Sequence, residues 1–228
     1  MFQGFTNKAS EFLWELAFNN DREWFREHKA EFEEYVRLPM NALLRDTVDG
    51  MNARFPEMRF SGHCSRIYRD ARRLFGRGPF KDELWFEVSS ADIGKNGPKF
   101  WFEISKSSFG FGMGYFEAPP AMLEAFRKSI AANPARFERI AKGIERHREF
   151  SVYGEEYARP KGDLGESINR WYNRKSIGCS CERDFGGDVL RTDLAEYLVS
   201  EFEKLMPLYN YLRELYLRAE NRPVEEQL

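Results

Sequence analysis

Positive charge is concentrated in one short stretch of this sequence, residues 66–81. Five arginines and one lysine occupy these sixteen positions, although the formal net charge of the chain is −2. Guanidinium groups bind phosphate and carboxylate through paired hydrogen bonds, and main-chain N–H groups near Gly76 and Gly78 could assist them. We therefore predict that this stretch binds a small anionic or phosphate-bearing ligand through Arg66, Arg69, Arg72 and Lys81.

The same stretch also allows a structural interpretation. If residues 65–70 form a strand, Arg66, Tyr68 and Asp70 share one face. Asp70 could then orient the arginines of the site, or could form closed ion pairs that pin the following loop to the sheet. An interaction or structural module with its arginines in internal salt bridges stays open beside the ligand-binding hypothesis.

Two nearly identical segments, "LWFEVS" and "FWFEIS", predict neighbouring strands with the same alternation. One face is apolar, and the other carries Trp85 and Glu87 from the first strand and Trp101 and Glu103 from the second. Indole rings over the glycines of "SFGFGMGYF" could simply stabilise the sheet. Alternatively, Trp85 and Trp101 form a platform that stacks a flat or sugar-like group, with the glutamates accepting its protons.

Carboxylates beside arginines also suit catalysis. In this alternative the protein is a hydrolase acting on a phosphate or glycosidic bond, with Asp70, Glu87 or Glu103 as acid or base. The arginines would then stabilise developing negative charge. The sequence alone does not decide whether the protein is an enzyme.

Composition predicts a soluble globular protein. A length of 228 residues with 42% hydrophobic and 32% charged residues fits one domain, which we place at residues 1–218, with a solvated tail at 219–228. The balanced charge argues against bulk nucleic-acid binding, and no segment is apolar enough to indicate a membrane span. Three cysteines without disulfide spacing favour a reducing cytoplasm.

The sequence predicts that both helices and strands position the candidate residues. The first sixty residues have helical periodicity, with Asn20 and Glu23 spaced as a capping box and Pro39 starting a new turn. Alternating segments follow, and helical periodicity returns after Pro120. We predict an α+β single domain with a central antiparallel sheet flanked by helices on its N-terminal and C-terminal sides.

The sequence gives little evidence for a bound metal or cofactor. His63 and Cys64 could meet Cys179 and Cys181, but neither spacing is usual for zinc, and buried thiols explain the cysteines better. The common phosphate-loop, nucleophile-elbow and zinc-protease motifs do not occur. We predict no metal and no cofactor.

The basic stretch resembles the signature of the family known as domain of unknown function 2461, which reads Arg-Ile-x-Arg-Asp-x-Arg-Phe, then Asp-Lys, then Pro-Tyr-Lys. The matching residues are Arg66, Ile67, Arg69, Asp70, Arg72, Pro79 and Lys81, with Phe80 in place of the tyrosine. The departures are Arg73, Gly76 and Arg77, which stand at the family's phenylalanine, aspartate and lysine. "NNDREWFREHKAEFEEYVRLP" and "GYFEAPPAMLEAFRKSI" look similar too, so the resemblance covers residues 5 to about 215. It implies a fold and no particular reaction.

Overall fold

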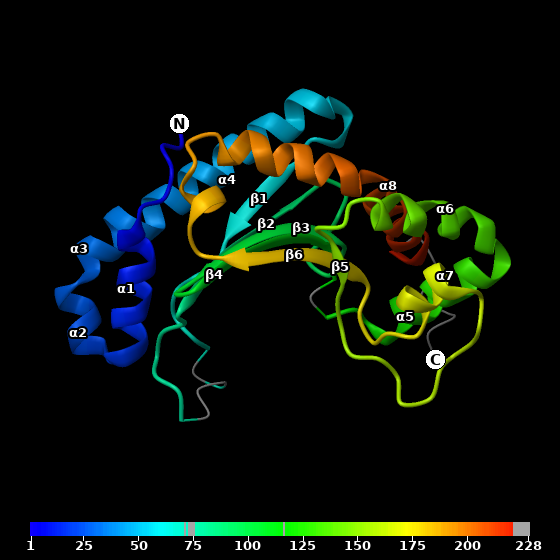
Figure 1. Ribbon diagram of the computed structural model, residues 1–228, viewed down its shortest axis with the longest axis horizontal. Coiled ribbons are helices and arrows are strands. Elements are labelled where there is room, and N and C mark those ends of the chain that lie inside the picture. The colour runs from blue at the N-terminus through cyan, green and yellow to red at the C-terminus, as the bar shows by residue number, and fades with distance from the viewer. Residues whose placement is uncertain (71, 73–75, 116, 221–228) are drawn as a thin grey trace. The chain divides into compact units, whose positions relative to one another are not determined.

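A computed structural model describes residues 1–70, 72, 76–115 and 117–220 (Figure 1). The strands form a six-stranded antiparallel sheet in the order β1-β2-β3-β4-β6-β5. They are β1 (Ser61–Cys64), β2 (Glu83–Ser89), β3 (Lys99–Ser105), β4 (Ser108–Gly114), β5 (Ser151–Val152) and β6 (Gly178–Asp184). The helices are α1 (Asn7–Phe18), α2 (Arg22–Glu27), α3 (Lys29–Phe32), α4 (Leu38–Arg54), α5 (Pro120–Ala132), α6 (Pro134–Glu145), α7 (Glu166–Tyr172) and α8 (Leu194–Glu220). The fold is α+β, as the alternating and helical periodicities predict.

The described residues pack into two compact units. The first comprises the described residues of Met1–Ser90, Trp101–Phe111 and Glu182–Glu201, and the second comprises those of Ala91–Phe100, Gly112–Cys181 and Phe202–Leu228. The domain boundary at residue 218 stays a prediction. Helix α8 extends through Glu220, so it includes the first two residues of the predicted tail. The other tail residues, 221–228, lie outside the described residues, as does Arg73.

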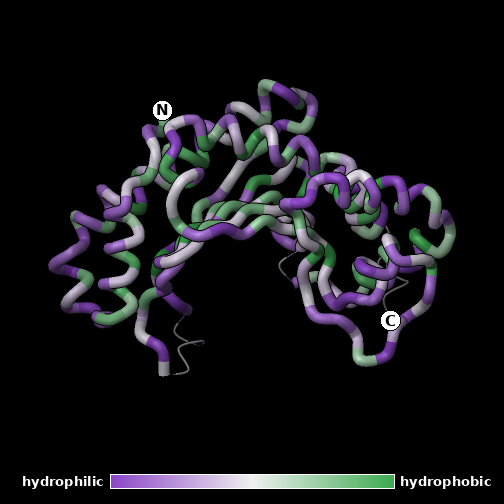
Figure 2. The backbone as a smooth tube through the Cα atoms, viewed as in Figure 1, coloured by the Kyte–Doolittle hydropathy of each residue, from purple (hydrophilic) through white to green (hydrophobic). Residues whose placement is uncertain are grey.

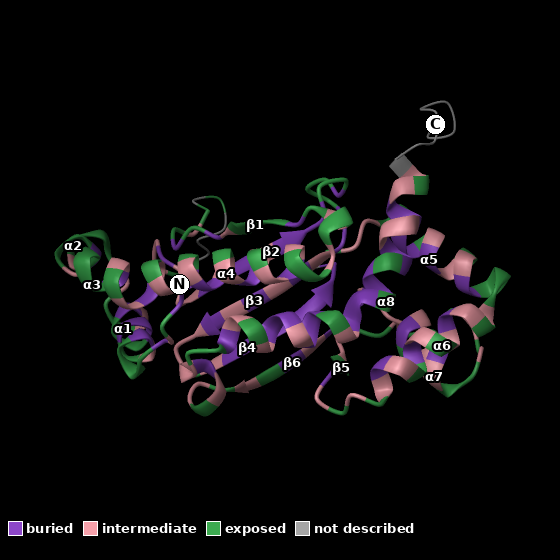
Figure 3. Cartoon of the chain, turned by 90° about the horizontal axis from the view of Figure 1, so that it is seen from above, coloured by how far each residue is buried: buried purple, intermediate pink, exposed green. Residues whose placement is uncertain are grey.

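The core of the first unit lies on one face of the strands β2 and β3. Alternation buries Leu84, Phe86 and Val88 completely, together with Phe102 and Ile104. Helix α4 lies against this face: a Cβ at Gly62 of β1 would overlap Leu44 and approach Val48, both on α4. Figure 3 shows the buried strand residues beneath α4. Side chains at the intervening positions are only half-buried, which leaves the other face available for polar residues.

The second unit has an aromatic core between its helices. Phe126 of α5 and Phe137 of α6 meet edge to face with ring centroids 5.0 Å apart, and Trp171 of α7 meets Phe137 in the same way at 5.8 Å. Tyr211 of α8 joins the cluster at 5.3 Å from Phe137. Hydrophobic and hydrophilic residues alternate along these helices (Figure 2), consistent with one buried side each.

Two local predictions are wrong. Asn20 does not cap the second helix: Asp21 does, because its carboxylate accepts the main-chain N–H groups of Glu23 and Trp24, both at 2.9 Å. Residues 65–70 do not continue as a strand, since β1 ends at Cys64 and only an isolated bridge joins Tyr68 to Phe80. The helix that begins beside Pro39 agrees with the prediction, and so do the two strands formed by "LWFEVS" and "FWFEIS".

Candidate functional site

The two ends of the basic segment, residues 66–81, are held side by side within the first unit. The Arg69 N–H donates to the Pro79 carbonyl and the Lys81 N–H donates to the Ile67 carbonyl, both at 2.8 Å. The bridge between Tyr68 and Phe80 lies between these two bonds. The segment is therefore an arm closed at its base, with its ends fixed by main-chain hydrogen bonds.

Asn20 anchors this arm to the helices. Its amide oxygen accepts the Phe80 N–H and its amide nitrogen donates to the Phe80 carbonyl, both at 2.9 Å. The Phe80 ring, 1% exposed, stacks on Phe25 of α2 with centroids 4.1 Å apart. A Cβ at Gly78 would overlap the Asn20 main-chain oxygen, so glycine is required where the arm meets this residue. The sequence interpretation missed this anchoring role.

Two arginines that the sequence predicts as ligand-binding have partners inside the arm. The Arg69 guanidinium donates to the carbonyls of Gly78 at 3.3 Å and Phe80 at 3.1 Å. Arg72 forms a bidentate pair with Asp70 at 3.1 and 2.7 Å, and its side chain is 88% exposed. Arg69 thus helps to close the arm, and the Asp70–Arg72 pair is a surface ion pair of small energetic weight.

Three other cations of the arm have no such partner. Arg66, Arg77 and Lys81 make no ion pair or side-chain hydrogen bond with the residues that the structure describes. Arg66 and Arg77 are exposed, whereas Lys81 is half-buried. The Lys81 ammonium lies 5.6 Å from the centroid of the Trp85 ring, within the range of a cation–π contact. The structure therefore brings together Lys81 of the basic segment and Trp85 of the tryptophan platform, which belong to separate sequence-based hypotheses.

Burial also changes the acid–base properties of Lys81. Partial loss of water lowers the pKa of the Lys81 ammonium, and the nearby positive charge of Arg69 lowers it further. The carboxylates of Glu83 and Glu103 act in the opposite direction. Lys81 therefore lies among charges of both signs.

Glu103 of β3 is the most strongly perturbed carboxyl of this face. Burial, helped by the negative charges of Glu83 and Glu182, raises its pKa from 4.5 to about 7, and Lys81 only partly opposes this. At neutral pH the side chain is therefore divided between its acid and carboxylate forms. The sequence predicts Glu103 but not Glu83 or Glu182. Alternation along β2 gives the signal for Glu83, because it shares the face of Trp85.

We call this surface the polar face: Trp85 and Glu87 of β2 with Trp101 and Glu103 of β3, all half-buried. Glu87 pairs in register with His63 of β1. Next to the ends of β2 and β3, the Lys106 ammonium donates to the Asp82 carboxylate at 2.6 Å. Burial acts to raise the pKa of Asp82, but this hydrogen bond helps to hold it below its usual value. The polar face is therefore rich in charge of both signs.

The cysteines lie in different surroundings. Cys64 is half-buried beside Arg37, whose guanidinium donates to its sulfur at 3.2 Å, and burial raises the pKa of the Cys64 thiol in spite of that cation. Cys179 is buried, and burial raises the pKa of its thiol strongly. In the described part of the chain, no three histidine, cysteine or acidic side chains are grouped as metal ligands.

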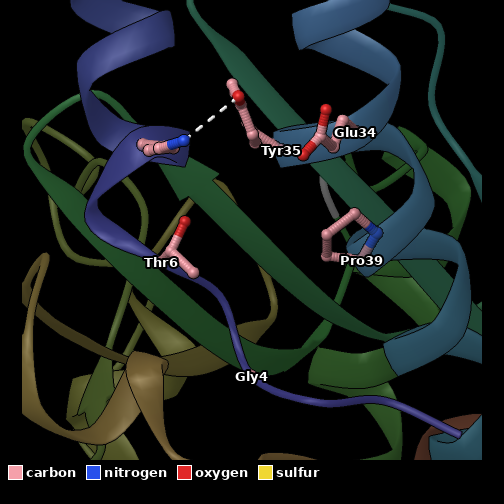
Figure 4. Close-up of a pocket in the computed structure, with 6 residues that line it drawn as sticks. Gly4, Thr6, Glu34, Tyr35 and Pro39 are labelled. Carbon is pink, nitrogen blue, oxygen red and sulfur yellow. Dashed lines mark hydrogen bonds between the residues drawn. The ribbon is translucent and has the colours of Figure 1, made fainter.

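A separate hollow of about 330 Å³ lies in the first unit near the start of α1 (Figure 4). Thr6, Glu34, Tyr35 and Pro39 contribute to its lining, and the Lys8 ammonium donates to the Tyr35 hydroxyl at 3.2 Å. None of the predicted ligand-binding residues lines it. Of the candidate residues, Lys81, Trp85, Glu103 and Arg69 come together where the polar face meets the arm.

These observations define an α+β protein with a basic arm beside a mixed-charge sheet face. The chain matches the model of the family described as conserved hypothetical protein DUF2461 over residues 8–211, so it belongs to that family. A search of curated proteins gave no match. Among the described helices, none is both long and apolar enough to cross a membrane.

Proposed function

We propose that the first unit binds a small anionic ligand where the polar face meets the base of the arm, with Lys81 as the principal cation. The observation that carries this proposal is Lys81 itself. A half-buried ammonium that forms no ion pair with the described residues costs free energy that an anion would recover. Trp85 supplies an adjacent flat surface. A phosphate or carboxylate with a planar or sugar-like group attached fits this combination.

The arginines then divide into two roles. Arg69 holds the arm closed through the Gly78 and Phe80 carbonyls, so it positions Lys81. Arg66 is exposed and has no ion pair within the described residues, so it can reach toward a bound anion. Tyr68, 57% exposed, and Trp101 offer further contact surface. Arg72 contributes only if it releases Asp70.

Thermal unfolding at constant ionic strength tests the proposal. The probes are inorganic phosphate, ribose 5-phosphate and adenosine monophosphate, with sodium chloride as the ionic control. A ligand at one hundred times its dissociation constant adds about 2.7 kcal/mol, which for this length raises Tm by roughly 5–10 °C. Lys81→Gln should abolish the rise, whereas Lys29→Gln on the exposed side of α3 should preserve it. Equal rises in both variants would refute the proposal.

A second candidate function, acid–base catalysis, is favoured by Glu103. A carboxyl with a pKa of about 7 can both accept and donate a proton at neutral pH. Together with Lys81, it could protonate a leaving group beside a bound anion. Hydrolysis of 4-nitrophenyl phosphate and 4-nitrophenyl glycosides is the direct assay. Glu103→Gln should reduce any turnover by a factor of about 10² or more, and turnover that persists in this variant would exclude Glu103 as the acid or base.

A further inference from the structure

A second hollow, of about 600 Å³, lies wholly within the second unit between α6 and α8. This volume falls within the range of small-molecule sites. Helix α6 contributes Ile140, Gly143 and Ile144 to its lining, and α8 contributes Pro207. Ile140, Gly143 and Ile144 are three and four residues apart, so they lie on one side of α6, and Pro207 lines the hollow from α8.

Gly143 lines the hollow from α6 and contributes no side chain to it. It lies inside α6, where glycine is less favourable than alanine. Its backbone has no left-handed conformation, and a Cβ built there would meet nothing within 4 Å. Neither backbone geometry nor close packing requires this glycine. Its effect on the structure is the space it leaves beside Ile140 and Ile144.

The polar lining of the hollow is entirely basic. It comprises Arg136, Arg139, Arg146, His147 and Lys204. Two of these cations are neutralised, Arg136 by Glu214 and Lys204 by Glu149 at 2.9 Å. Arg139 and Arg146 form no ion pair with any residue that the structure describes, and Arg139 donates only to the Ala135 carbonyl of its own helix, at 3.3 Å.

The helix dipole explains only part of this charge. Cations are stabilised at the C-terminal end of a helix, which accounts for Arg146. Arg136 and Arg139 lie in the N-terminal half of α6, where the dipole disfavours positive charge, and the first turn contains no acidic residue. All of these basic residues line the hollow, whereas only some of them lie at the end of the helix that favours positive charge.

We propose that this hollow binds an amphiphilic anion: a phosphate or carboxylate head group held by Arg139 and Arg146, on an apolar body that fills the space beside Gly143. The apolar lining accounts for the body, and the two unpaired guanidinium groups account for the head group. The head group could come from a small soluble molecule or from an anionic lipid, and both present the same chemistry. This site is separate from the one proposed in the first unit.

Isothermal titration of the full chain with hexyl phosphate tests the proposal, with inorganic phosphate and hexanol as the two half-ligands. Hexyl phosphate should bind at least tenfold more tightly than either half. Arg139→Gln and Arg146→Gln should each weaken binding about tenfold, as expected for loss of a charge-assisted hydrogen bond. Lys142→Gln is the matched control, because Lys142 is exposed on α6, pairs with Glu138 and does not line the hollow.

Filling the hollow is the second arm of the test. Gly143→Met should abolish hexyl phosphate binding without unfolding the protein, since the added side chain enters open space, and Gly143→Ala should raise Tm and largely retain binding. Sedimentation with phosphatidic acid vesicles, against phosphatidylcholine vesicles, identifies a lipid source if Gly143→Met also abolishes it. Hexyl phosphate binding that is unchanged in Gly143→Met and in both arginine variants, or no binding at all, overturns the proposal.

Discussion

Replacing Glu103 by glutamine should change the pH dependence of stability in a defined direction. The Glu103 pKa is about 7 in the folded protein and near 4.5 when the chain is unfolded. Between these values the folded state binds more protons than the unfolded state, so the free energy of unfolding falls as pH rises. Glutamine has no charge to bury, so the variant should lose this part of the pH dependence.

The magnitude follows from the shift. At about 1.36 kcal/mol per pKa unit, a rise from 4.5 to about 7 corresponds to roughly 3 kcal/mol. Because Glu103 is not completely buried, solvent screens part of this, and we expect Glu103→Gln to gain about 1–3 kcal/mol over the wild type at pH 8. At pH 4.5 the two proteins should be nearly equal in stability.

Urea unfolding at pH 4.5, 6 and 8 measures this difference. Glu11→Gln is the control, because Glu11 is exposed on α1 and should show no such pH-dependent gain. If the wild type and Glu103→Gln differ by the same amount at all three pH values, the Glu103 carboxyl is not held in its acid form by burial. The reasoning about the polar face would then be wrong.

The remaining predictions concern the arm and the helix before it, and urea midpoints check all of them. Asn20→Ala leaves the Phe80 N–H without its partner and removes one of the two donors to the Phe80 carbonyl, which Arg69 still contacts, so it should cost about 1–3 kcal/mol. Arg69→Gln should lower the midpoint clearly, whereas Arg72→Gln should leave it unchanged; the reverse order would contradict the assigned roles. Asp21→Ala removes the helix cap and should cost about 1 kcal/mol, a loss that Asp21→Asn should largely avoid.

The elements that the sequence predicted well are those set by local periodicity. Alternation alone separates Phe86 and Phe102 from Glu87 and Glu103, because successive residues of a strand face opposite sides. The two faces therefore follow without knowledge of the strand order. The helical periodicity that returns after Pro120 is equally local, and the helices α5, α6 and α8 follow it.

The features that the sequence did not reveal involve partners that no local pattern identifies. Asn20 and Asp21 are both good helix caps, and what separates them is Phe80, sixty residues away, which takes the Asn20 amide. The raised pKa of Glu103 comes first from its burial and then from Glu83 and Glu182; the contribution of Glu182, on β6, follows from strand order rather than from any local pattern. The role of Arg69 depends on main-chain carbonyl groups of the arm. Every residue has such a carbonyl, so the sequence does not indicate which of them a side chain will contact.

The proximity of Lys81 and Glu103 gives a last prediction about how anion binding responds to pH. Each influences the pKa of the other, so an anion held at Lys81 would be repelled by the Glu103 carboxylate but not by its acid form. Anion binding should therefore be accompanied by uptake of a proton at Glu103. The affinity for the anion should fall as pH rises through about 7. Sulfate, which stays fully ionised in this range, separates this effect from titration of the ligand. Sulfate affinity should fall between pH 6 and 8 in the wild type and stay level in Glu103→Gln; the same fall in both proteins would show that Glu103 and the anion do not interact.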